Sequence, residues 1–432
     1  MTGNVYHEIR DPVHEFIRLD SDERQVLDSL PVQRLRHIHQ LAMGYLVYPG
    51  ATHKRFEHSL GVMELASRVY DTIIRSDLVH DKVRRLFRGV IENEDQRRYW
   101  RRVLRMAALC HDIGHLPFSH AAEAELLPEE WTHETITVEL IRNPEMQEIW
   151  LGVTPPLTTE HVVKLAVGPA KLPNEDFSDW EAVLSEIIVG DAFGVDRMDY
   201  LLRDSLHTGV SYGRFDHHRL IDSLRILPKY ENSEEPTLGL DRGGLGSAEA
   251  LRMARYWMFN QVYFHPVRRA YDIHLKDFLS DWLPQGHFPT ATKDFLELTD
   301  IEVFAAMRQG TKNVSEHAQR IMERNHFRVV YSWDPEDLKA NPEPGKAIGQ
   351  ALAQKFGKDR IRLDSYTPRG EPFDFPVLQS DERIASSALL SLVLSNIPLA
   401  IIDYVFVDPA IRDEARRFVA ENREELLAES SA

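Results

Sequence analysis

Apolar residues recur at helical spacing over the first two thirds of the chain, a pattern typical of amphipathic helices that pack around a shared core. The segment 229–245 carries Pro236 and several glycines, and it predicts a loop or a short hairpin. The pattern predicts helices near 21–29, 31–41, 58–76, 79–92, 94–112, 119–126, 132–142, 145–151, 159–166, 178–190, 196–206, 216–225 and 246–283.

The pattern changes after about residue 285. Runs of β-branched and aromatic residues predict strands, and they lie at 327–333, 360–366, 373–378 and 400–407. Helical spacing returns at 344–357, 384–397 and 409–428. We therefore expect a mainly α protein, with a helical domain at 1–285 and a smaller α+β lobe at 286–432.

The composition fits a protein of a reducing compartment. Cys110 is the single cysteine among 432 residues, which excludes an intrachain disulfide framework. No apolar run approaches the roughly 18 residues that a membrane helix needs. We expect a cytoplasmic protein without a membrane partner.

The formal net charge of −17 argues against a general nucleic-acid-binding surface, because lysine and arginine bind phosphate backbones. The stretch 97–105 nevertheless combines arginines with Tyr99 and Trp100. It could form a nucleic-acid surface or the solvated face of a helix, and we favour the second interpretation.

The doublet His111-Asp112 is the most informative motif. The apolar helical run 103–109 leads into it, and Gly114 and Pro117 predict the helix end just beyond. Neighbouring side chains on a helix point about 100° apart, yet both can reach an ion lodged at its end. The doublet is therefore a candidate metal corner.

Two other predicted helices carry residues of the same kinds near their first turns, namely His58 and Asp196. Together with the doublet they make a mixed imidazole and carboxylate set. Such a set suits a divalent ion such as Mn, Fe, Zn or Ni, and its carboxylates also admit Mg. An ion of this kind can assist phosphate cleavage, and His115 and His133 are candidates for the accompanying proton transfers.

Six motifs follow one another in a recognisable order. They are Asp11-Pro12-Val13-His14 and the stretches 31–41, 48–58, 111–120, 195–204 and 268–271. Their order and spacing resemble the HD superfamily of metal-dependent phosphohydrolases, and within it the dNTP triphosphohydrolases, some of which carry a SAM domain ahead of the HD domain. The resemblance covers roughly residues 5–280 and implies that the helical domain is an HD-domain core.

The resemblance implies a role for each matching residue. The metal ligands would be His58, His111, Asp112 and Asp196. The catalytic residues would be His115, His133, Glu123 and His120. The substrate-binding residues would be Gln40, Leu41, Arg55, Arg197, Tyr200, Asp204 and Tyr271. A site for an activating guanine nucleotide would include Asp28, Gln33, Arg36 and Arg219.

Four positions depart from the family pattern. Glu123 stands where the family has an aspartate beside its catalytic histidine, and we expect the added methylene to weaken that contact. Arg197 stands where lysine is common, and it would still bind phosphate. Tyr263 replaces an arginine that grips the terminal phosphates, and Val267 replaces a pocket histidine. These last two changes bear on triphosphate specificity.

The resemblance predicts hydrolysis of dNTPs to a deoxynucleoside and triphosphate. In the family, Gln40, Tyr200 and Asp204 match a pocket in which a tyrosine under the sugar excludes a 2′-hydroxyl. Activation by GTP or dGTP would require a homo-oligomer, a dimer or a tetramer, because such sites lie between subunits. The alternative is an HD phosphohydrolase or phosphodiesterase that acts on another nucleotide or on single-stranded nucleic-acid ends. A third hypothesis, a nucleotide sensor without turnover, fits the intact ligand set least well.

Overall fold

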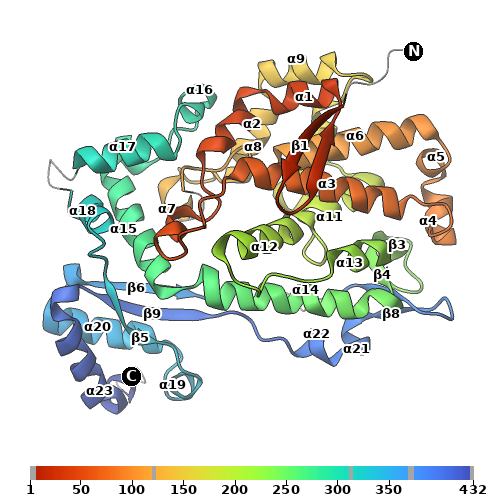
Figure 1. Cartoon of the computed structure of the whole chain (residues 1–432). Helices are drawn as coiled ribbons and strands as arrows, with labels where there is room; N and C mark the ends of the chain where they lie inside the picture. The colour runs from red at the N-terminus through yellow and green to blue at the C-terminus, as the bar shows by residue number, and fades with distance from the viewer. Residues whose placement is uncertain (1–5, 119–122, 311–314, 368–373, 429–432) are drawn as a thin grey trace.

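The computed structural model describes residues 6–118, 123–310, 315–367 and 374–428. Helices make up most of the molecule, and small sheets lie at its edges (Figure 1). The predicted fold class, a helical core with a smaller α+β lobe, is confirmed. None of the described helices combines the length and the apolar composition that a membrane span requires.

Three helices at the centre position the functional site. α3 (Arg55–Ile73) packs against both α6 (Glu94–Cys110) and α12 (Val195–Thr208). The side chain of Asn93 caps α6 by accepting hydrogen bonds from the first backbone N–H groups of the helix. α12 ends where Gly209 adopts the left-handed conformation with φ 77°, which glycine tolerates at no steric cost.

The other α-helices of the described residues lie around these three or, like α20 and α23, in a separate core. They are α1 (Ser21–Leu27), α2 (Leu30–Arg34), α4 (Asp81–Leu86), α5 (Arg88–Ile91), α7 (Glu123–Leu126), α8 (His133–Ile141), α9 (Pro144–Gly152), α10 (Thr159–Val167), α11 (Asp179–Val189), α13 (His217–Ser223), α14 (Leu245–Met258), α15 (Pro266–Trp282), α16 (Thr292–Leu296), α17 (Asp300–Gly310), α18 (Glu316–Met322), α19 (Pro335–Ala340), α20 (Pro344–Phe356), α21 (Ser387–Leu390), α22 (Leu392–Asn396) and α23 (Arg412–Ala428).

The strands form three small sheets. β1 (His7–Asp11) and β2 (Glu15–Leu19) make an antiparallel hairpin in which His7 lies opposite Leu19. The second sheet has the order β3-β4-β7-β8 and the third β5-β9-β6, and within the second β4 and β7 run parallel. These strands are β3 (Leu224–Pro228), β4 (Pro236–Asp241), β5 (Arg328–Ser332), β6 (Ile361–Tyr366), β7 (Pro376–Leu378), β8 (Ile384–Ser386) and β9 (Ile402–Val407).

Buried apolar side chains of the described residues form two large cores and one small cluster, and the boundary between the large cores does not lie at residue 285. The main core continues through Phe295, Val303 and Ile321, and it also takes in Val377 and Leu394 from the second sheet and α22. The second core packs α20 and α23 against the third sheet. Strands β7 and β8 follow β6 in the sequence but pair in the second sheet beside β4, and β9 then returns to the third sheet, so the lobe is not one continuous segment of the chain.

Several element predictions need correction. The single helix expected at 246–283 is interrupted by a π-helical turn at Phe259–Tyr263, and α15 begins anew at Pro266. Proline lacks an N–H and disfavours the helical conformation in the residue before it, and His265 is accordingly not helical (φ −56°, ψ 125°). The helix expected at 31–41 is α-helical only to Arg34, and a 3-10 turn at Leu35–His37 leads to an isolated bridge between His39 and Lys54.

Other elements were not predicted at all. The hairpin of β1 and β2 and the three helices α16, α17 and α18 had no clear sequence pattern of their own. The loop or hairpin expected at 229–245 is a hairpin of β3 and β4, as predicted.

A buried histidine joins the lobe to α15. His274 is fully buried, and its Nε2 accepts a hydrogen bond of 3.0 Å from the backbone N–H of Phe327 at the start of the lobe. Its Nδ1 lies 3.2 Å from Nδ1 of His317. Burial lowers the pKa of His274 to about 2, and the neighbouring His317 and Arg320 act in the same direction.

This depressed pKa predicts a loss of stability in acid. Below about pH 6.5 the unfolded chain protonates this histidine while the folded chain does not, so folding weakens as the pH falls. Lowering the pH from 8 to 5 should reduce the free energy of unfolding by about 2 kcal/mol through His274 alone. Urea unfolding of His274→Gln should show a smaller pH dependence than the wild-type protein. Substitution of the exposed His287 should leave the dependence unchanged, and equal slopes for His274→Gln and wild type would refute this assignment.

Candidate active site

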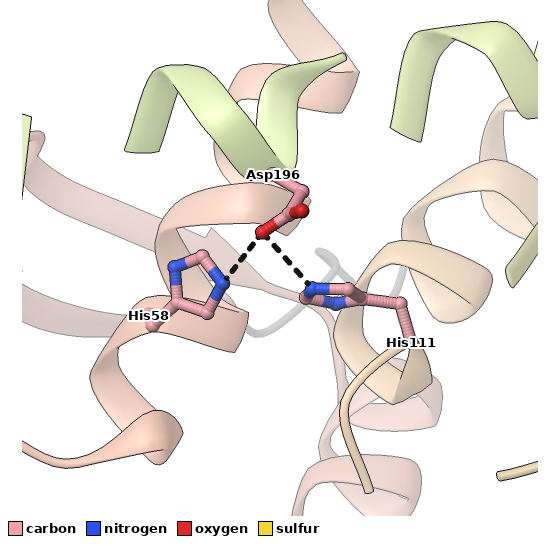
Figure 2. Close-up of side chains that lie close together, drawn as sticks. All are labelled: His58, His111 and Asp196. Atoms are coloured by element: carbon pink, nitrogen blue, oxygen red, sulfur yellow. Dashed lines mark hydrogen bonds and ion pairs between the residues drawn. The ribbon is translucent and has the colours of Figure 1, made fainter. Parts of the chain in front are cut away.

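Three helices bring two imidazoles and a carboxylate together. His58 lies in the first turn of α3, His111 caps the C-terminus of α6, and Asp196 lies in the first turn of α12. Nε2 of His58 is 3.1 Å from Oδ1 of Asp196, and Nε2 of His111 is 3.6 Å from the same oxygen (Figure 2). One ligand atom from each residue lies within 4.8 Å of the others, so the three side chains could hold a metal ion.

The fourth predicted ligand, Asp112, lies beside this group and also contacts other residues. Its Oδ1 is 3.3 Å from Nε2 of His111, and its Oδ2 is 3.7 Å from Nε2 of His58. Arg55 donates a hydrogen bond to Oδ2, and Nε2 of His115 lies 3.2 Å from Oδ1. Asp112 therefore connects the candidate metal centre to the candidate catalytic histidine.

The far sides of both imidazoles are held by hydrogen bonds. Nδ1 of His111 contacts the carbonyl oxygen of Ala108 at 2.8 Å, which makes Nδ1 the donor and turns Nε2 toward the centre. Nε2 is buried and has no hydrogen-bond partner in the described part of the chain. Nδ1 of His58 contacts Oδ2 of Asp199 at 2.8 Å. A carboxylate or carbonyl behind the imidazole is the usual support of a metal-ligating histidine.

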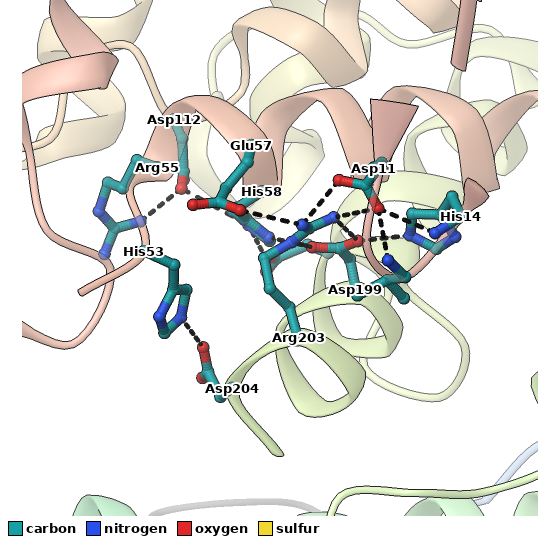
Figure 3. A network of polar contacts seen from close by, with 12 residues as sticks. Asp11, His14, His53, Arg55, Glu57, His58, Asp112, Asp199, Arg203 and Asp204 are labelled. Atoms are coloured by element: carbon teal, nitrogen blue, oxygen red, sulfur yellow. Dashed lines mark hydrogen bonds and ion pairs between the residues drawn. The ribbon is translucent and has the colours of Figure 1, made fainter. Parts of the chain in front are cut away.

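Asp199 is a buried positioning residue that the sequence analysis did not single out. It contacts Nε2 of His14 at 2.6 Å and accepts a hydrogen bond from Nε of Arg203 at 2.9 Å (Figure 3). Arg203 also pairs with Asp11 at 2.8 Å. Gly61 permits this packing, because a Cβ there would lie 1.9 Å from Oδ1 of Asp199. The spacing of Asp196, Asp199 and Arg203 on one helix was the signal that could have revealed this network.

The electrostatics of the centre favour added positive charge. Burial lowers the pKa of His58, but the hydrogen bonds to Asp196 and Asp199 outweigh burial and raise the pKa to about 10. Burial would raise the pKa of Asp196, yet its contacts with His111 and His58 hold it well below its usual range. Carboxylates that stabilise positive charge this strongly fit a divalent cation, which would take the place of the protons.

The candidate catalytic residues His115, Glu123 and His133 form a second cluster next to the centre. The rings of His115 and His133 stack with centroids 4.1 Å apart. Glu123 contacts both Nδ1 of His133, at 2.6 Å, and its backbone N–H, at 2.7 Å. The longer side chain of Glu123 therefore does not weaken the contact, contrary to the prediction. His120, also predicted here, lies outside the described residues.

Close packing positions the loop that carries His115. Gly114 allows it, because a Cβ there would lie 2.2 Å from the carbonyl oxygen of His133. The buried Arg34 donates hydrogen bonds to the carbonyl oxygens of His115 and Leu298, at 2.8 and 2.9 Å. Residues beyond 285 thus support the active-site loop.

Burial, with a further effect from Arg55, keeps the pKa of His115 well below its usual range, so this imidazole is neutral near pH 7.

The predicted substrate pocket is partly assembled around Asp204. Its Oδ1 contacts Nε2 of His53 at 2.7 Å, and its Oδ2 accepts a hydrogen bond from the hydroxyl of Tyr263 at 2.8 Å. Two predicted pocket atoms, Oε1 of Gln40 and the hydroxyl of Tyr271, are buried without a hydrogen-bond partner among the described residues. Tyr271 packs against His326, 4.7 Å between ring centroids, and Leu41 is buried.

Three arginines gather near Tyr200, and two of them, Arg252 and Arg255, were not predicted. Burial lowers the pKa of Arg252 to about 10, and the like charges of Arg255 and Arg197 act in the same direction. The guanidinium of Arg255 has no hydrogen bond or ion pair with the described residues, and it lies 5.5 Å from the ring of Phe259. Arg197 donates to the carbonyl oxygens of residues 190 and 191. An anion near Tyr200 would meet these positive charges.

The residues predicted for an activating nucleotide are engaged within the chain. Gln33 accepts a hydrogen bond from Arg36 at 2.8 Å, and Asp28 accepts one from Arg24 at 3.2 Å. Arg36 also lies over the ring of Phe56, and Arg219 is exposed on α13. A nucleotide site at these residues stays a prediction.

Replacing Asp199 tests whether it supports the metal centre. Asp199→Asn should weaken Mn²⁺ binding about 10-fold to 100-fold, because outer carboxylates orient a ligating imidazole and increase its basicity. Equilibrium dialysis followed by metal analysis measures this affinity. Asp11→Asn is the matched control, since it also removes a carboxylate from Arg203 but leaves His58 untouched. Wild-type affinity in Asp199→Asn would contradict this role.

Comparison with known protein families matches two segments of the chain. Residues 55–166 match the HD domain, and residues 215–358 match the HD associated region. The crystal structure of a hypothetical protein from Aquifex aeolicus is similar to the chain at 33% identity and TM-score 0.78, covering 96% of this chain and 99% of that one.

Curated relatives agree with this assignment. An uncharacterized protein of Methanocaldococcus jannaschii is 31% identical over 76% of this chain and 60% of its own length. The human deoxynucleoside triphosphate triphosphohydrolase SAMHD1 is 29% identical over 86% of this chain and 62% of its own length. The chain thus spans about 60% of these two relatives. It belongs to the HD-domain superfamily of metal-dependent phosphohydrolases and resembles the dNTP triphosphohydrolases within it.

Proposed function

We propose that the protein hydrolyses deoxynucleoside triphosphates to deoxynucleoside and triphosphate, with a divalent ion bound by His58, His111, Asp112 and Asp196. The observation that carries this proposal is the convergence of imidazole and carboxylate groups from α3, α6 and α12 on one buried point. When bound there, the ion supplies positive charge to the phosphoryl oxygens.

The cluster of His115, Glu123 and His133 would carry out the proton transfer. Because Nδ1 of His133 donates to Glu123, Nε2 is the ring atom that would exchange a proton with the reacting groups. The Glu123 carboxylate stabilises the charged imidazole that forms when Nε2 takes up a proton. His115, kept neutral and stacked on His133, lies between that ring and Asp112. This arrangement suits donation of a proton to the 5′ oxygen of a departing deoxynucleoside.

The cations near the centre support a phosphorylated substrate. Arg55 lies at Asp112, and Arg197 lies with Arg252 and Arg255 near Tyr200. Both sets can bind phosphate oxygens through planar guanidinium groups.

Tyr263 favours a second candidate. This uncharged residue stands where the resembled family has a phosphate-binding arginine, so an HD phosphohydrolase of a nucleotide with a shorter phosphate chain is the alternative. Homo-oligomer formation, activation by GTP or dGTP, and a cytoplasmic location remain predictions.

The reaction can be tested by its products. Incubation of the Mn²⁺-loaded protein with each dNTP should release a deoxynucleoside and intact triphosphate, with little turnover of the matching NTP. Ion-exchange chromatography with and without GTP resolves these products. Release of orthophosphate or pyrophosphate in place of triphosphate would overturn the proposal and favour the alternative.

The role of Glu123 can be tested separately. Glu123→Gln should lower kcat about 10-fold to 100-fold with unchanged metal content, because the imidazolium of His133 loses its counter-charge. Glu134→Gln is the matched control, since Glu134 lies 3.4 Å from Nδ1 of His133 but pairs with Lys171 at 2.6 Å. A larger loss of kcat in Glu134→Gln than in Glu123→Gln would contradict the assignment.

A further inference from the structure

Tyr263 lies beside Tyr200 and Asp204, two of the predicted substrate-binding residues. It closes the π-helical turn between α14 and α15, an irregularity that often occurs at functional sites. Its side chain packs edge-on against Tyr200, with ring centroids 6.1 Å apart, and its hydroxyl donates a hydrogen bond of 2.8 Å to Oδ2 of Asp204. A residue that stands in the place of a phosphate-binding arginine is therefore directed at a carboxylate instead.

The carboxylate of Asp204 is held by two hydrogen bonds and can accept further ones. The residue is 1% exposed, and its other oxygen contacts Nε2 of His53 at 2.7 Å. The ring of His53 stacks on that of His207 with centroids 4.3 Å apart, which restricts how the imidazole can turn. Each carboxylate oxygen can accept two hydrogen bonds, and here each has one from a side chain.

A buried acceptor atom without a hydrogen-bond partner among the described residues lies near Asp204 and His53, and it indicates a ligand. Oε1 of Gln40 is buried and has no hydrogen-bond partner among the described residues. The backbone N–H of Gln40 donates to the carbonyl oxygen of His53 at 3.0 Å, which places Gln40 beside the residue that holds Asp204. An unpaired buried acceptor destabilises the folded protein, and a hydroxyl donor on a substrate would remove that cost.

The positions along α12 match the parts of a nucleotide. Asp196, Tyr200 and Asp204 are four residues apart and lie on one face of this helix. The first and last are separated by about 12 Å along the helix axis. This distance leaves room for a phosphoryl group at Asp196, a pentose beside the ring of Tyr200, and a sugar hydroxyl at Asp204.

We propose that Tyr263 is a specificity residue that recognises the 3′-hydroxyl of the pentose together with Asp204. With its own proton directed at Asp204, the Tyr263 oxygen presents a lone pair, and the sugar hydroxyl can donate to it or to Oδ2. This inference rests on the proposed function, since it assumes a nucleotide with its α-phosphate at the metal centre. Position 263 would then bind the sugar through a hydrogen bond, whereas an arginine at this position would bind phosphate through its charge.

Substrates with and without the 3′-hydroxyl test this proposal. The Mn²⁺-loaded wild-type protein should show a kcat/KM for dATP about 100-fold above that for 2′,3′-dideoxy-ATP, because a site built to bind a hydroxyl discriminates against its loss. Tyr263→Phe removes only the hydroxyl. It should reduce this preference about 10-fold, mainly through dATP.

The control is Tyr331→Phe, which removes an equivalent hydrogen bond, from the Tyr331 hydroxyl to Asp337 at 2.9 Å, inside the lobe. It should keep the wild-type preference. An unchanged preference in Tyr263→Phe, or an equal loss for both substrates, would overturn the proposal.

A second measurement separates this inference from the proposed reaction. If the wild-type protein hydrolyses no dNTP, the proposed function fails. Calorimetric titration with deoxyadenosine and dideoxyadenosine monophosphates then tests the sugar site alone. Tighter binding of the deoxy compound, reduced in Tyr263→Phe, would still support the role of Tyr263. Equal binding of the two compounds by the wild-type protein, or no binding of either, would overturn it.

Discussion

The site depends on one buried ionic arrangement, the carboxylate of Asp199 held among His58, His14 and Arg203. A buried carboxylate is stable only when its charge is compensated and its oxygens are hydrogen-bonded. Here the compensation comes from α12 itself, from α3 and from the turn after β1, so the three segments cannot shift independently. Because the fixed imidazole of His58 faces Asp196, the same arrangement sets the geometry of the candidate metal centre.

This packing also places residues of two different sites on α12. Its first turn supplies Asp196 to the metal centre, and its later turns supply Tyr200 and Asp204 to the proposed sugar site. The lobe also holds α15, which carries the predicted substrate residue Tyr271, because Arg269 binds Asp364 with two hydrogen bonds of 2.6 and 2.5 Å. The tyrosine hydroxyl of Tyr404 also donates to the carbonyl oxygen of Phe264, at 3.1 Å. The lobe thereby fixes the segment that carries Tyr263.

The sequence predicted the main parts of this site because local patterns encode them. The apolar run before His111 and the glycine and proline after it placed the doublet at a helix end, and the structure agrees. Contacts between distant segments had no such pattern. The hydrogen bond of Tyr263 to Asp204 and the approach of Arg34 to the loop of His115 arise only from the packing of separate helices.

The predicted helix at 246–283 illustrates the same limit. Its apolar periodicity is continuous, but Pro266 and the π-helical turn before it redirect the chain and bring Tyr263 into the pocket. The predicted boundary at 285 rested on a change in composition, whereas the core follows packing and continues through Ile321.

Anomalous diffraction from crystals grown with Mn²⁺ would show whether an ion binds where α3, α6 and α12 meet. We expect one strong peak per chain, within bonding distance of Nε2 of His58, Nε2 of His111, Asp112 and Asp196. A peak found only among His115, Glu123 and His133, or none in the protein, would contradict this expectation.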